Sequence, residues 1–86
     1  MTTEYSVIVL ETDNFEPKSW SDNPSQGAFC AMVEPTTLQD AQEVARGFNE
    51  ASLADKGNRW AIVTPAKARM YEAGQIIHVE GNHLLN

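Results

Sequence analysis

Cysteine is nearly absent from this 86-residue chain, and it contains no long apolar run. Because Cys30 is the only cysteine, no intramolecular disulfide can form, which argues against a secreted scaffold held together by disulfides. The N-terminus has no basic segment leading into an apolar run, and Val7–Leu10 is too short for a signal peptide or a membrane span. We therefore expect a cytoplasmic protein that does not enter a membrane.

Basic residues are also scarce. The chain has 6 Lys and Arg against 12 Asp and Glu, which gives a formal net charge of −6. Most of the acids lie in residues 1–43, where Lys18 is the single base, and such an acidic half disfavours direct binding to nucleic acid. The segment from Lys56 to Arg69 has bases and no acid, which would suit an acidic partner, including a second copy of the chain; a solvated surface is the ordinary alternative.

The remaining composition is that of an ordinary globular protein, with 42% hydrophobic residues, and the length fits one small domain over residues 1–86. Short β-branched and apolar segments, bounded by charged residues, proline or glycine, predict four strands. These segments are residues 5–10, 28–33, 59–64 and 76–79.

One helix is predicted between the second and third strands. Apolar residues recur at spacings of three and four from Leu38 to Ala51, which is typical of a helix with one buried face. Thr36 and Gln39 form a capping-box pattern at its start, and Gly57 suits the left-handed position at its end. Gly47 inside the helix suggests that another backbone approaches closely there.

Residues 65–73 allow two interpretations, a short helix beginning after Thr64 or a hairpin that turns near Ala73 and Gly74. With either, the order of elements predicts an α+β fold: a four-stranded, largely antiparallel sheet with the main helix packed on one face.

Both faces of every predicted strand are largely apolar, whereas a sheet with one solvated face would alternate apolar and polar residues. One helix covers part of one face, so another element must cover the rest. We expect either a homodimer formed through an apolar sheet face or a fold in which the long 13–27 loop covers the open face.

The 13–27 loop carries two aromatic residues, Phe15 and Trp20, and loops of this length in small domains are commonly functional or packed on themselves. Trp20 is either a plug over the core or an anchor for a partner. The large aromatic side chains are the candidate interaction residues: Phe15, Trp20, Trp60 and Tyr71.

No catalytic motif, phosphate-binding loop or metal-ligand cluster is present in the sequence, and we expect no cofactor. The function predicted first is therefore a non-enzymatic binding module whose partner is a second copy or another protein. The alternatives are an acidic inhibitor that mimics nucleic acid and acts on a nucleic-acid-binding protein, and a small enzyme or ligand-binding protein with a pocket near Cys30 and His78.

Overall fold

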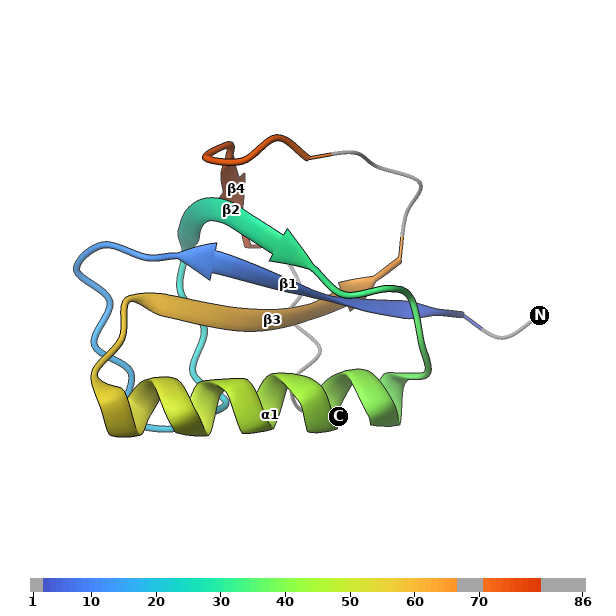
Figure 1. Ribbon diagram of the computed structural model, residues 1–86, viewed down its shortest axis with the longest axis horizontal. Helices are drawn as coiled ribbons and strands as arrows, with labels where there is room; N and C mark the ends of the chain where they lie inside the picture. Colours follow the sequence, from blue (N-terminus) through green and yellow to red (C-terminus); the bar gives the residue numbers. More distant parts are fainter. Residues whose placement is uncertain (1–2, 67–70, 80–86) are drawn as a thin grey trace.

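The computed structural model describes residues 3–66 and 71–79. This part of the chain forms four strands and one helix, which are β1 (Tyr5–Glu11), β2 (Gln26–Met32), α1 (Leu38–Asp55), β3 (Arg59–Pro65) and β4 (Ile76–His78). The strands form one antiparallel sheet in the order β3-β1-β2-β4, and α1 runs along the sheet beside β3 (Figure 1). The predicted α+β fold is confirmed.

The start of β2 depends on a glycine. A Cβ atom at Gly27 would lie 2.7 Å from the Cβ of Leu10 and 2.9 Å from the carbonyl oxygen of Glu11, so no other residue fits without a backbone shift. The strand begins at Gln26, two residues earlier than predicted. Farther along, Val9 pairs with Ala31 but Leu10 pairs with Phe29, which leaves Cys30 as the extra residue of a β-bulge.

The N-cap of α1 is Thr37, and the prediction of Thr36 is wrong by one residue. The hydroxyl oxygen of Thr37 accepts a hydrogen bond of 3.2 Å from the backbone N–H of Asp40. Thr36 instead exchanges two backbone hydrogen bonds of 2.8 Å with Tyr5. Because this pairing holds Thr36 in extended backbone, the helix begins after the next residue.

The predicted roles of two glycines are also corrected. Lys56, and not Gly57, adopts the left-handed conformation at the helix end, with φ of 51°. The N–H of Gly57 then donates to the carbonyl of Ser52 at 3.0 Å, which completes a Schellman-type cap. At Gly47 an added Cβ would meet nothing within 4 Å among the described residues, so no backbone in this part of the chain approaches the helix there.

The segment before β4 ends in a turn. The N–H of Gln75 donates to the carbonyl of Glu72 at 2.9 Å, and Gly74 has a φ of +85° that favours glycine. Pro65 belongs to β3, and Tyr71 lies outside any strand. Residues 67–70, on which the choice between a short helix and a hairpin depends, lie outside the described residues.

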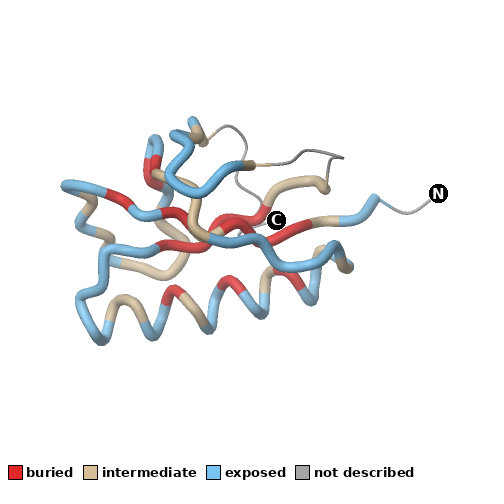
Figure 2. The backbone as a smooth tube through the Cα atoms, turned by 45° about the horizontal axis from the view of Figure 1, so that its top comes forward, coloured by how far each residue is buried: buried red, intermediate tan, exposed pale blue. Residues whose placement is uncertain are grey.

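The sheet separates two clusters of buried side chains. Buried positions lie along the central strands and recur along α1 (Figure 2). On the helix side, Val7 and Val63 pack against Ala41 and Ala45 of α1. The other side is centred on neighbouring residues of β1 and β3, namely Ile8, Leu10, Trp60 and Ile62, which are all 3% exposed or less.

The side of the sheet away from the helix is largely covered by the chain itself. Phe15 from the β1–β2 loop packs edge-on against Trp60, with ring centroids 5.4 Å apart. Tyr71 stacks on Phe29 at 5.2 Å, and Ile77 of β4 packs on the same cluster. As expected from the sequence, one helix does not cover both faces of the sheet. On this side the additional cover comes from the same chain.

Candidate interaction surface

The helix covers only half of its own side of the sheet. It packs against β3 and β1. On β2, Ala31 pairs with Val9, and the N–H of Val33 donates to the carbonyl of Val7 at 2.9 Å. Since Val7 and Val9 face the helix, the alternation of strand side chains places Ala31 and Val33 on that side too. Both are exposed, Val33 by 40%.

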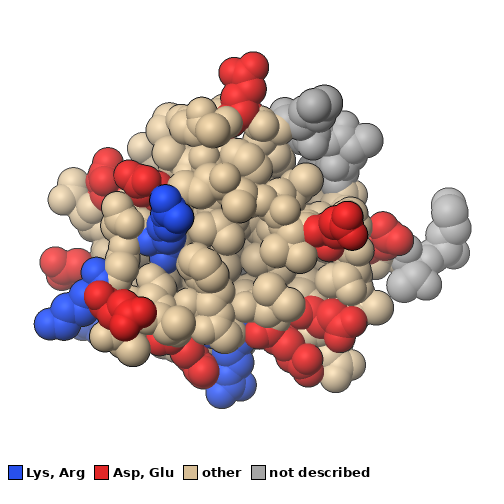
Figure 3. Space-filling model, viewed as in Figure 1, with Lys and Arg blue, Asp and Glu red and all other residues tan. Residues whose placement is uncertain are grey.

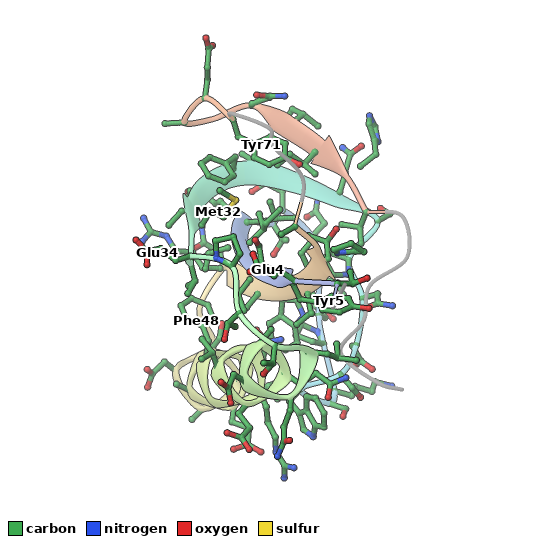
Figure 4. The ribbon with its side chains drawn as sticks, turned by 90° about the vertical axis from the view of Figure 1, so that its right-hand side faces the viewer. Glu4, Tyr5, Met32, Glu34, Phe48 and Tyr71 are labelled. Atoms are coloured by element: carbon green, nitrogen blue, oxygen red, sulfur yellow. The ribbon has the colours of Figure 1, made fainter. Side chains whose placement is uncertain are left out.

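The neighbouring flank of α1 is apolar as well. Phe48 is half-buried against the helix-side cluster, and Val44, one helical turn before it, is 47% exposed. In Figure 4, Phe48 rises from α1 toward the sheet on the side of the molecule where Glu34 lies. We name these residues the helix-side surface: Ala31, Val33, Val44 and Phe48.

Acidic residues border this surface. Glu34 follows Val33, and Asp40 precedes Val44 by one helical turn on the same flank of α1; both carboxylates are exposed. Figure 3 shows this face of the molecule, where uncharged atoms form a continuous central area and charged side chains gather toward its edges. An apolar centre with a charged border is the usual arrangement of a protein-binding surface.

Trp20 is part of the fold. It is half-buried against the helix-side cluster, and the guanidinium of Arg46 lies 4.9 Å from its ring centroid. The carbonyl of Trp20 accepts a hydrogen bond of 3.0 Å from the side-chain amide of Asn49. These contacts favour the plug interpretation of this residue over a free anchor.

The other predicted interaction residues are spread around the cluster on the far side of the sheet. Trp60 is 1% exposed and donates from its indole N–H to the carbonyl of Asp22 at 2.8 Å, so its ring lies in the core. Phe15 and Tyr71 are half-buried. The structure brings Phe15 and Trp60 into contact, but it places Trp20 on the other cluster and Tyr71 against Phe29.

Sequence reasoning missed Asn49, which is completely buried. Its side-chain amide accepts from the N–H of Ala61 at 2.8 Å and donates to the carbonyl of the same residue at 2.9 Å. The side chain thus pairs with β3 as a neighbouring strand would. A signal was available, because Asn49 is a polar residue on the face of α1 that holds Ala41 and Ala45.

The pocket predicted near Cys30 and His78 receives no geometric support. His78 pairs with Gln26, and Cys30 lies four residues farther along β2, or about 13 Å at the rise of a strand. The thiol of Cys30 is directed to the carbonyl of Ala28 at 3.6 Å. Within residues 3–66 and 71–79, no three His, Cys, Asp or Glu side chains are grouped to hold a metal ion.

None of the helices in the described ranges has the length and apolar character needed to cross a membrane. Comparisons of the chain with protein-family models, with curated proteins and with solved structures gave no match.

Proposed function

We propose that this protein is a non-enzymatic protein-binding module and that the helix-side surface is its binding site. The observation that carries the proposal is the uncovered apolar area between β2 and α1, where Val33, just after β2, and Val44 of α1 are exposed by 40% and 47%. On the other side of the sheet, the cluster around Leu10 and Trp60 is covered by residues of the same chain, and Met32 at the end of β2 is exposed. An exposed apolar patch with several members from a strand and a helix is typical of an interaction site.

The charges around the helix-side surface favour a particular kind of partner. Glu34 and Asp40 at its border attract a partner whose apolar contact is flanked by lysine or arginine. A second copy that met this surface about a nearby two-fold axis would bring these acids toward their own counterparts, which costs association energy. We therefore favour another protein at this surface, with self-association through it as the second candidate.

A double variant tests this proposal. Val33→Ser with Val44→Ser removes apolar contact at two exposed positions, so the fold remains, while binding of a partner captured by the wild-type protein falls at least tenfold. Met32→Ser is the matched control, because Met32 is 43% exposed and pairs with Ile8, whose side chain points away from the helix.

Equal loss of binding in the control and in the double variant would place the partner elsewhere. Equal binding by the double variant and the wild-type protein would refute the proposal. The predicted alternative, an acidic inhibitor, rests on the charge of residues 1–43. Inhibition of a nucleic-acid enzyme that disappears in high salt is its test.

A further inference from the structure

The two edge strands of the sheet differ in how their outward backbone groups are paired. At β3, side chains of α1 bind such groups. Asn49 occupies both backbone groups of Ala61 that point away from β1, and the hydroxyl of Ser52 donates to the carbonyl of Arg59 at 2.6 Å. Pro65, at the end of the strand, has no N–H to offer. These are devices that prevent an edge strand from pairing with another chain.

The edge at β4 has a different character. The N–H of Val79 donates to the carbonyl of Ser25 at 2.9 Å, and the N–H of Phe29 donates to that of Gln75 at 2.8 Å. Hydrogen-bonded and non-hydrogen-bonded pairs alternate in an antiparallel ladder, so Ile77 also faces β2. The backbone groups of Ile76 and His78 therefore point away from the sheet.

This outer edge is accessible. Ile76 is 54% exposed, the highest value among the large hydrophobic side chains of the described residues, and His78 is exposed as well. In Figures 1 and 4, β4 is the outermost strand of the sheet, with no other described strand or helix beyond it. From Gln75 to Val79 the strand also lacks proline and lysine, the residues that commonly block edge pairing.

We propose that β4 pairs antiparallel with β4 of a second copy, about a two-fold axis through Ile77. In this register Ile76 lies opposite the second copy's His78, and each of these residues donates one backbone hydrogen bond and accepts one. The strand is self-complementary there, since the two residues with outward backbone groups lie symmetrically on either side of Ile77. No other register pairs both residues at once.

The pairing also joins the two binding surfaces. Ile76 pairs with Ala28, which pairs with Glu11, and this places Ile76 on the helix side of the sheet. The uncovered sides of β2 in the two copies then lie on one continuous sheet, with the exposed Ile76 side chains between them. The inference rests on the backbone geometry of β4, and it holds whether or not the helix-side surface binds another protein.

A three-residue edge gives a small contact, so we expect a weak dimer with a dissociation constant of roughly 0.1–1 mM. Sedimentation equilibrium from about 10 µM to 2 mM should show the mass rising from 9.5 kDa toward twice that value. Ile76→Lys puts a charge into the junction at an exposed position and should keep the protein monomeric. Val44→Lys, at a position of similar exposure on the helix-side surface, should leave the association unchanged.

The opposite pattern, in which Val44→Lys abolishes the dimer and Ile76→Lys does not, would assign it to the helix-side surface. A wild-type protein that stays at the monomer mass throughout would also overturn the inference. Neither result depends on the partner-capture experiment, so the two proposals succeed or fail separately.

Cysteine cross-linking tests the register. In a Cys30→Ala background, an Ile76→Cys protein mixed with a His78→Cys protein should form the mixed disulfide several-fold faster than either protein forms its own. Opposite residues have Cα atoms about 5.5 Å apart, whereas the same position in the two copies is separated by about 8–9 Å, beyond the reach of a disulfide. Equal rates for all three combinations would exclude the proposed pairing.

Discussion

Replacing Asn49 with leucine is the most direct test of how the helix and sheet are held together. Asn49 is 0% exposed, and its amide makes the three hydrogen bonds to Ala61 and Trp20 described above. Leucine has the same number and branching of side-chain heavy atoms, although its methyl groups are bulkier, and it can make none of these bonds. The N–H and carbonyl of Ala61, itself 0% exposed, would then be left without their side-chain partner.

The size of the effect follows from these two groups. A buried backbone group that loses its partner costs about 1–3 kcal/mol, so Asn49→Leu should lower the free energy of unfolding by about 2–6 kcal/mol. A domain of this length has about 4–13 kcal/mol in total. The variant should therefore melt tens of degrees lower or fail to fold at 37 °C.

Urea unfolding followed by far-ultraviolet circular dichroism measures this loss without depending on the fluorescence of Trp20. Asn49→Asp retains an acceptor for the N–H of Ala61 but places a carboxylate against two carbonyl oxygens, so it should be at least as destabilising. Glu50→Gln is the control, because its ion pair with Arg46 is exposed and should contribute less than about 0.5 kcal/mol. A loss below about 1 kcal/mol for Asn49→Leu would show that water or another group replaces the amide, and the reasoning would fail.

Two glycines provide predictions of opposite sign, both measured by the same urea titration. Gly27→Ala places a Cβ 2.7 Å from that of Leu10, and since the second close atom belongs to the backbone, we expect a loss of about 1–3 kcal/mol; unchanged stability would show that β2 shifts easily. Gly47→Ala meets open space within the helix and should stabilise the protein by about 0.5–1 kcal/mol, whereas a loss would reveal a contact at this position that the structure does not contain.

The sequence was sufficient for the elements and for their arrangement as an α+β fold. Strands rich in β-branched residues and the three-and-four spacing from Leu38 to Ala51 are local patterns, and each appears in the structure within a few residues of its predicted place. The error at the start of the helix had a non-local cause. Thr36 fits an N-cap by sequence, but its pairing with Tyr5, which is distant in the chain, moves the cap to Thr37.

The apolar character of both strand faces also predicted correctly that the helix would leave much of the sheet to be covered. The alternation of residues along each strand does not show which elements cover the sheet. The strand order β3-β1-β2-β4 brings Phe15, Tyr71 and Ile77 onto the side away from the helix, and the position of α1 over β3 and β1 leaves Val33 and Val44 open. Strand order depends on contacts between distant residues, and alternation within a strand carries no information about them.

The candidate recognition residues differ between the sequence and the structure for the same reason. Sequence determined that Trp60, Phe15 and Asn49 are present and that large aromatic residues are candidates for recognition. Tertiary structure decided that Trp60 is in the core, that Asn49 closes part of the edge at β3, and that the helix-side surface and the edge of β4 stay open. Burial and hydrogen-bond pairing belong to the assembled sheet, because an edge strand acquires a free side only when the order of its neighbours is fixed.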